Sequence, residues 1–209
     1  MKQPILIIGF LAVLICAGCF GELPTLPHGE EEYSEINTFS EPIQTPHEGE
    51  IIYREADSRE YTLVSVATYT APVLVVGTKH YYDEDAELVP IDLCVVWGEL
   101  AQPEYLQYTD FIQEERGCEC IYEEGSPVDA PDVLNQFVNM HLIPATETIL
   151  QAIKTIRKGQ KVVLEGFLVD IYLDGEIYIE TSTTRTDDGI GSCEVLYVTK
   201  VRIGNTVYE

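Results

Sequence analysis

The sequence predicts an α+β domain in which antiparallel strands predominate and one main helix packs against them. Three observations indicate this class: recurrent segments rich in Val, Ile, Tyr and Thr, one strongly amphipathic helical segment, and a long strand-like segment that bends at a glycine. The stretch 51–209 has the length of one domain with its own core. We therefore expect a single globular, β-rich domain over these residues.

The expected strands are 61–69, 72–76, 91–97, 105–112, 161–173, 176–180 and 194–203. The last of these alternates most clearly, because side chains along a strand point to opposite faces in turn. Strict alternation would place five residues on one face: Val195, Tyr197, Thr199, Val201 and Ile203.

Gly166 lies inside the long segment 161–173, where we expect a bulge or a sharp bend. Asp174-Gly175 then predicts a tight hairpin turn into 176–180. A long bent strand followed by a hairpin is typical of small Greek-key barrels such as the OB-fold, although other antiparallel sheets use it as well. The expected architecture is therefore a small OB-like barrel or a twisted sheet.

The main helix is expected at about 146–158. Its apolar stripe consists of Ile149, Leu150, Ile153 and Ile156, and Gly159 follows as a stop signal. A shorter helix is predicted over 130–138.

The N-terminus resembles an export signal. Lys2 precedes an apolar run over 5–19 that ends in Ala17-Gly18-Cys19, the layout of a lipoprotein signal that leaves a lipid on Cys19. The run is shorter than the roughly twenty residues of a membrane-spanning helix. We therefore expect an extracytoplasmic protein of the cell envelope, lipid-anchored to the membrane. Ordinary cleavage and an uncleaved anchor are the alternatives.

Residues 20–50 are predicted to form an acidic flexible linker, with eight Glu, no Lys or Arg, and four prolines. The whole chain has 36 acidic against 12 basic residues and a formal charge of −24. This balance excludes nucleic acid as a partner, because a phosphate backbone requires basic patches. The expected partners are the membrane, through the anchor, and an envelope protein or a small-molecule ligand.

Four cysteines lie in the domain: Cys94, Cys118, Cys120 and Cys193. An even number in an exported protein favours two disulfides. Cys118 with Cys120 is the least favourable pair, because so tight a loop strains the bridge. We expect a bridge from Cys193 to either Cys118 or Cys120, and the other pairings stay open.

Three polar segments interrupt the apolar pattern and supply candidate site residues. Trp97 is expected either to pack in the core or to stack on a ligand, and His141 either to fix its loop or to act as a general acid or base. Arg185 could hold an anion or form a structural ion pair. Asp187 and Asp188 are the candidate ligands for a divalent cation such as Ca²⁺.

A nucleophile site is the enzymatic alternative. His141 would act as the base for a nucleophile, which would be Cys193, Ser182 or Ser192, and Asp187 would be the acidic member. The sequence lacks Gly-x-Ser-x-Gly and the glycine-rich phosphate-binding motifs, so no catalytic setting is recognisable and no cofactor is expected.

Four motifs together resemble a family of uncharacterised prokaryotic exported or envelope proteins. The motifs are Cys94-Val-Val-Trp97-Gly98, Asn139-Met-His141-Leu-Ile-Pro144-Ala145, Lys158-Gly-Gln-Lys-Val-Val-Leu-Glu-Gly166 and Thr184-Arg185-Thr-Asp187-Asp-Gly189-Ile-Gly191-Ser-Cys193-Glu194. The resemblance covers about 61–201. It implies one domain and an envelope location, and it carries no activity to transfer.

The leading functional hypothesis from sequence is a non-enzymatic binding or interaction module anchored at the envelope. The alternatives are the exported hydrolase described above and a divalent-cation-binding protein.

Overall fold

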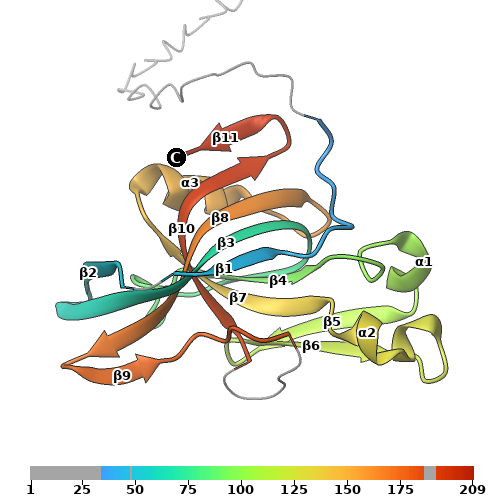
Figure 1. Cartoon of the computed structure of the whole chain (residues 1–209), viewed down its shortest axis with the longest axis horizontal. Helices are drawn as coiled ribbons and strands as arrows, with labels where there is room; N and C mark the ends of the chain where they lie inside the picture. Colours follow the sequence, from blue (N-terminus) through green and yellow to red (C-terminus); the bar gives the residue numbers. More distant parts are fainter. Residues whose placement is uncertain (1–33, 48, 186–191) are drawn as a thin grey trace, which may run out of the picture.

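The computed structural model of the 209-residue chain describes residues 34–47, 49–185 and 192–209. Its centre is a closed ring of five strands (Figure 1). The strands are β3 (Arg59–His80), β4 (Ile91–Val96), β7 (Phe137–Pro144), β10 (Glu194–Ile203) and β8 (Lys161–Leu173). The ring follows the order β3-β4-β7-β10-β8 and closes where β8 pairs with β3. Only the β7–β10 pair within this ring is parallel.

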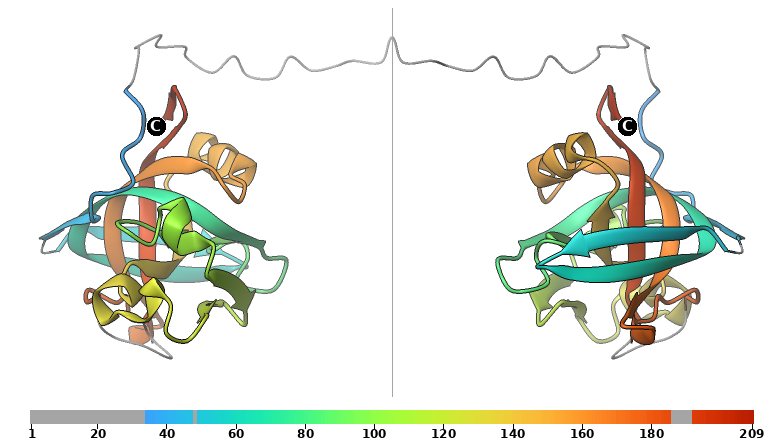
Figure 2. Two further views of the ribbon diagram at one scale, coloured as in Figure 1. Left: turned by 90° about the vertical axis from the view of Figure 1, so that its right-hand side faces the viewer. Right: turned by 90° about the vertical axis from the view of Figure 1, so that its left-hand side faces the viewer.

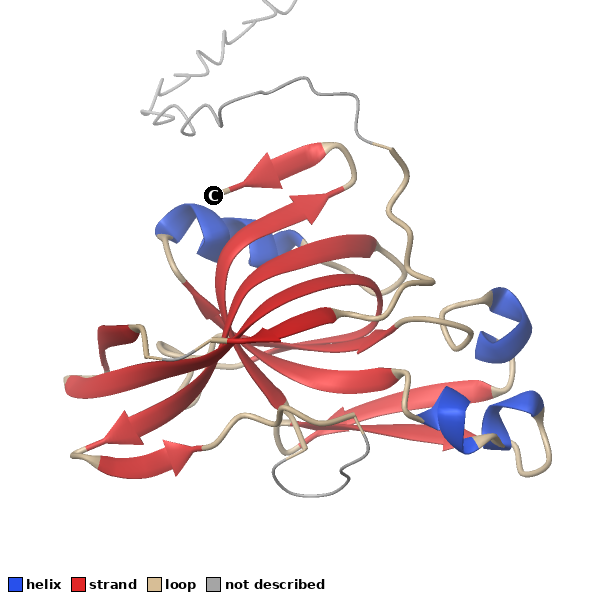
Figure 3. Ribbon diagram, in the orientation of Figure 1, coloured by secondary structure: helices blue, strands red, loops and turns tan. Residues whose placement is uncertain are grey.

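If the five ring strands are numbered by their order in the chain, their order around the barrel is first, second, third, fifth and fourth. The main helix, α3 (Glu147–Thr155), connects the third strand to the fourth and lies over one end of the barrel (Figures 1 and 2). This is the Greek-key arrangement of an OB-type barrel. The predicted α+β class and the OB-like architecture are therefore confirmed, and strands predominate over helices throughout (Figure 3).

Shorter elements extend the ring at its edges. β1 (Ile43–Pro46) and β2 (Ile51–Ala56) pair with β3, while β9 (Glu176–Ile179) pairs with β8 and β11 (Thr206–Tyr208) pairs with β10. The connection from β4 to β7 carries a separate hairpin of β5 (Thr109–Glu114) and β6 (Gly117–Tyr122). It also holds α1 (Pro103–Leu106), η1 (Pro127–Asp129) and α2 (Pro131–Leu134).

The N-terminal part of the described chain packs on the barrel. Ile36 is buried, and β1 pairs with β3 over four residues. The acidic linker predicted for 20–50 thus includes residues that the structure places in the folded domain. The predicted signal and Cys19 lie outside the described residues. Among the helices of the described chain, none has the length and apolarity needed to cross a membrane.

The inward faces of the ring strands form the main core. Leu93 of β4, Met140 and Leu142 of β7 and Leu196 of β10 are fully buried there. The helix α3 closes the core with Ile149 and Ile153, two members of the predicted stripe. Thr146 caps this helix by accepting a hydrogen bond from the backbone of Ile149 at 3.2 Å.

β3 is one continuous strand where the sequence predicts two. Pro72 lies at the interruption, between the residues paired with β1 and those paired with β4, while β8 pairs with the strand on both sides of the proline. Proline has no backbone N–H and is tolerated where one side of a strand is unpaired.

Two other predicted elements are wrong in kind or extent. The helix expected at 130–138 is only α2, and the polar segment that begins at Asn139 belongs to the central strand β7. In this strand the outward side chains Asn139 and His141 alternate with the core residues Met140 and Leu142, so the polar residues mark the outer face of a buried strand and not a loop. In the segment 105–112, Tyr105 and Leu106 are helical and the strand begins at Thr109.

Gly166 lies at a close approach of β8 to β10. A Cβ atom at this position would clash with the backbone carbonyl oxygen of Tyr197. The register between the two strands shifts between Val198 and Lys200, directly beside the glycine. The shift moves Val201 to the core side with Leu196, so the predicted strict alternation along 194–203 is wrong beyond Val198.

We expect Gly166→Ala to lower the free energy of unfolding by about 1–3 kcal/mol, because the added methyl group must displace a backbone carbonyl. Denaturation in urea measures this loss. Gly117→Ala is the matched control, since its new Cβ would meet the nearest atom, the Glu114 oxygen, at an ordinary 3.5 Å. Equal stabilities of the two variants would contradict the close approach at Gly166.

Candidate active site

The outer face of the β4–β7 pair carries a cluster of polar side chains. Asp92 on β4 is directly opposite His141 on β7, and both point away from the core that Leu93 and Met140 fill. Cys193 immediately precedes β10, whose first residue lies beside Met140. The parallel pairing of β7 and β10 therefore brings Cys193 to the same end of the barrel as Asn139.

Asp92 is the centre of the cluster and is completely buried. One carboxylate oxygen lies 2.8 Å from Nδ1 of His141. The other accepts hydrogen bonds from the hydroxyl of Tyr81 at 2.9 Å and from Nδ2 of Asn139 at 3.2 Å. A buried carboxylate is costly unless it is paired and hydrogen-bonded, and here both oxygens have partners.

His141 is held in its charged form by this arrangement. Burial of the ring opposes protonation, but hydrogen bonds and charge from Asp92 and Cys193 outweigh it and raise the pKa of His141 to about 9. The residue is only 8% exposed. Since Asp92 occupies Nδ1, the pair fixes the orientation of the ring, and Cys193 lies close enough to act as its second hydrogen-bond partner.

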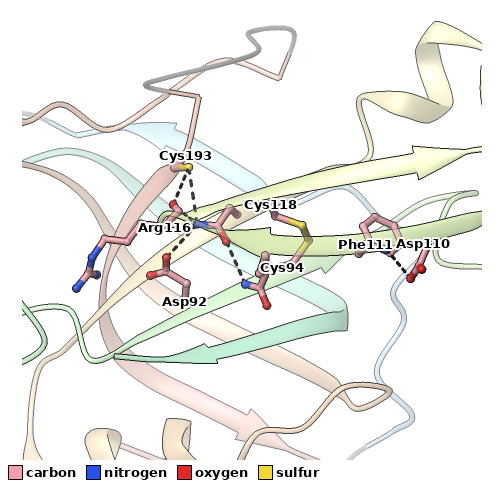
Figure 4. Close-up of a disulfide and its surroundings, with 9 residues drawn as sticks. Asp92, Cys94, Asp110, Phe111, Arg116, Cys118 and Cys193 are labelled. Atoms are coloured by element: carbon pink, nitrogen blue, oxygen red, sulfur yellow. Dashed lines mark hydrogen bonds between the residues drawn. A yellow bond between two sulfur atoms is a disulfide. The ribbon is translucent and has the colours of Figure 1, made fainter. Parts of the chain in front are cut away.

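The Cys193 sulfur has two further contacts. Asn139 approaches it with Nδ2 at 3.7 Å, and the thiol points to the carbonyl oxygen of Arg116 at 3.8 Å. Figure 4 shows Cys193 and Asp92 beside Arg116, at the turn of the β5–β6 hairpin. Three segments that are distant in sequence thus meet at one sulfur atom.

The β5–β6 hairpin covers the cluster, and Arg116 at its turn holds it in place. The guanidinium forms an ion pair with Asp83 at 2.6 Å and lies 3.9 Å from the centre of the Tyr81 ring. Its NH1 group also donates to the Val89 carbonyl at 3.3 Å. The same residue therefore contacts the β3–β4 loop with its side chain and Cys193 with its backbone.

A disulfide between Cys94 and Cys118 ties the hairpin to β4 (Figure 4). Among the described cysteines, Cys120 and Cys193 are free. The predicted bridge from Cys193 to Cys118 or Cys120 is therefore wrong. The hairpin folds back over the barrel and places Cys118 against the outward-facing Cys94, an approach that sequence spacing does not reveal.

A pocket of about 650 Å³ opens beside Cys193. It lies between strand β6, helix α2, the start of β7 and the described ends of the loop before β10. Its lining includes Cys193, Asn139, Arg185, Phe137 and Leu134. Cys193 is the member of the polar cluster whose sulfur is positioned to meet a ligand there, while His141 lies behind it.

Arg185 and Trp97 belong to a neighbouring arrangement. Arg185 forms an ion pair with Glu194 at 2.6 Å and lies over the rings of Tyr69 and Trp97 at 5.3 and 5.5 Å. Trp97 is 1% exposed and packs in the core, so it takes the first of its two predicted roles. Arg185 has the structural ion pair predicted as one of its roles and also lines the pocket.

The remaining predicted site residues are dispersed. Ser182 is buried next to Cys193, to whose carbonyl its N–H donates at 3.0 Å, but its hydroxyl bonds to the backbone of Thr184 and the residue is outside the pocket lining, whereas Ser192 lies in that lining. Asp187 and Asp188 lie outside the described residues. In the part of the chain that the structure describes, no group of three or more His, Cys, Asp or Glu side chains is arranged to hold a metal ion.

Sequence reasoning missed Asp92, the acidic member of the cluster. Its signal is a single carboxylate within the otherwise apolar strand Ile91–Val96, since a charge in such a strand needs a buried partner. Tyr81 and Arg116 carry no comparable signal, because only the folded hairpin brings them to the cluster.

The fold and this cluster define an OB-type barrel with a carboxylate, an imidazole and a thiol in series on its outer face. Comparison of the chain with family models, curated proteins and solved structures finds no match.

The raised pKa of His141 predicts how stability depends on pH. Its contribution is fully present below the ordinary value of 6.5 and is lost as pH rises through about 9. We therefore expect the stability advantage of the wild type over His141→Gln to shrink over this range. Denaturation of both proteins from about pH 6 to about pH 10 tests this, and a difference independent of pH would contradict it.

Proposed function

We propose that this domain is a cysteine-dependent hydrolase with Cys193 as nucleophile and His141 as general acid and base. The observation that carries the proposal is the series Asp92–His141–Cys193, which leads from a fully buried carboxylate to a thiol on the wall of a pocket. Nucleophile, base and orienting acid in this order are the elements of triad chemistry. The sequence supplies Cys193 and His141 as candidates, and its candidate for the acidic member, Asp187, lies outside the described residues.

The chemistry begins with the Cys193 proton on His141. The thiolate attacks the carbonyl carbon of an ester, forming a C–S bond and moving the C=O electron pair to oxygen. Collapse of this intermediate expels the alkoxide, which takes the proton from His141 and leaves as an alcohol. Neutral His141 then removes a proton from water, whose attack on the thioester releases the carboxylic acid and regenerates Cys193.

Asp92 and Asn139 act as positioning residues in this scheme. Asp92 holds the His141 ring through Nδ1 and stabilises its positive charge. Asn139 links the two ends of the series, because its Nδ2 group contacts both the Asp92 carboxylate and the Cys193 sulfur. Gln113 of β5 in turn donates to Oδ1 of Asn139 at 3.2 Å and fixes the amide.

We place this activity at the cell envelope. The proposal rests on the export-type N-terminus with Cys19 as the lipid-bearing residue, which would anchor the domain to the membrane. The Cys94–Cys118 disulfide agrees with an oxidising compartment.

Hydrolysis of p-nitrophenyl acetate tests the proposal. We expect nitrophenol to be released faster with the wild type than in buffer alone. The rate with Cys193→Ala should be at least about a hundredfold lower than with the wild type. Ser182→Ala is the control that should keep the wild-type rate, since Ser182 lies outside the pocket lining. Equal rates for the wild type and Cys193→Ala would overturn the proposal.

The non-enzymatic binding module is the second candidate. The observation that favours it is the start of the third ring strand, β7, in the pocket wall, because OB-type barrels bind ligands at the face that their second and third strands form. If the wild type hydrolyses no ester while the pocket still binds apolar compounds, this candidate replaces the first.

A further inference from the structure

We infer that the pocket beside Cys193 accepts an uncharged, apolar group, so that the substrates are esters or thioesters with an apolar acyl chain. The inference rests on the proposed function for its chemistry and on the pocket wall for its specificity. The apolar part of that wall comes from three elements, β6, α2 and β7, and consists of Cys118, Tyr122, Pro131, Leu134, Phe137 and Val138.

The wall is rigid on the side that would contact a chain. Cys118 is fixed to β4 by the disulfide, and Phe137 packs against Phe111 of the hairpin with ring centres 6.1 Å apart. Leu134 and Phe137 are only partly buried, so each has surface left to cover. Covering such surface with a ligand is favourable, because apolar area leaves water.

Charge in and around the pocket disfavours an anionic ligand. The positive side chain in its lining, Arg185, is already paired with Glu194 at 2.6 Å. Glu119 adds a carboxylate to the lining, and the whole chain carries a formal charge of −24. An acyl group with its own carboxylate would approach against this field.

The size of the pocket sets the range of chain lengths. A volume of about 650 Å³ falls among the ligand sites of small-molecule enzymes. Each methylene buried there strengthens binding by up to about fourfold, until the pocket is filled.

Labelling of Cys193 by N-alkylmaleimides tests the specificity directly. Methyl, propyl, pentyl and heptyl derivatives would be compared with a carboxyalkyl derivative, and peptide mass spectrometry would assign the label to Cys193. We expect the second-order rate to rise about twofold to fourfold per methylene and then level off, with the carboxyalkyl reagent slowest. Rates independent of chain length, or fastest for the carboxylate, would overturn the inference.

Leu134→Gln should flatten the dependence on chain length, whereas Ile177→Gln, exposed on β9, should leave it unchanged. The comparison of the reagents on the wild-type protein tests the inference even if neither variant folds. The same comparison also separates this inference from the proposed function. If the labelling rate depends on chain length but no ester is hydrolysed, the apolar pocket is retained and the hydrolase is rejected. If esters are hydrolysed but the labelling rate does not depend on chain length, the hydrolase is retained and the apolar pocket is rejected.

Discussion

Replacing Asp92 with alanine is expected to lower the free energy of unfolding by about 3–5 kcal/mol. The variant removes a fully buried carboxylate from three partners at once. It leaves His141 in the barrel wall without the Asp92 charge, so that burial opposes protonation with only Cys193 acting against it, and the pKa of the ring falls below its wild-type value of about 9. Equilibrium denaturation at neutral pH measures the loss of stability, and NMR titration of His141 measures the fall in its pKa.

Tyr81→Phe is the matched control for this variant. It removes one hydrogen bond to the same carboxylate and leaves the His141 contact in place, so a loss of about 1.5–3 kcal/mol is expected. If Asp92→Ala were no more destabilising than Tyr81→Phe, the carboxylate would not be the centre of the cluster.

Removing the Cys94–Cys118 disulfide is expected to have the second largest effect. The two residues are 24 positions apart, and a loop of this length corresponds to about 3.5 kcal/mol of stability. The double variant Cys94→Ala/Cys118→Ala avoids leaving a new thiol in the buried position of Cys94. Because the bridge ties the hairpin over Cys193, we expect faster alkylation of Cys193 by iodoacetamide together with the loss of stability.

A reducing agent supplies the control for the disulfide. It should destabilise the wild type by an amount similar to the double substitution and should not change the stability of the double variant. A wild type with the same stability under oxidising and reducing conditions would show that the bridge contributes little.

The sequence predicts the parts of the fold that depend on local patterns. The helix α3 follows from its apolar stripe, and the hairpin at Asp174-Gly175 follows from turn chemistry, with both residues at positive φ. Gly166 indicates the tight bend because only a residue without Cβ fits beside the Tyr197 carbonyl. These signals lie within a few residues of the structures that they predict.

The candidate site depends on long-range pairing and is only partly predictable. His141 and Cys193 are chemically conspicuous, but their meeting requires the parallel register of β7 with β10. Sequence reasoning selects Asp187 because it lies in the same polar segment as Cys193, and this residue is outside the described part of the chain. The strand pairing instead places Asp92, 49 positions from His141, within hydrogen-bond distance.

The most direct test of the thiol–imidazole–carboxylate series is the alkylation rate of Cys193 by iodoacetamide at neutral pH, in the wild type and in His141→Gln. Cys120 serves as an internal reference, because burial raises its pKa to about 11 and keeps it protonated. We predict that Cys193 reacts much faster than Cys120 in the wild type and at least about tenfold more slowly in His141→Gln. An unchanged rate in His141→Gln would contradict the account.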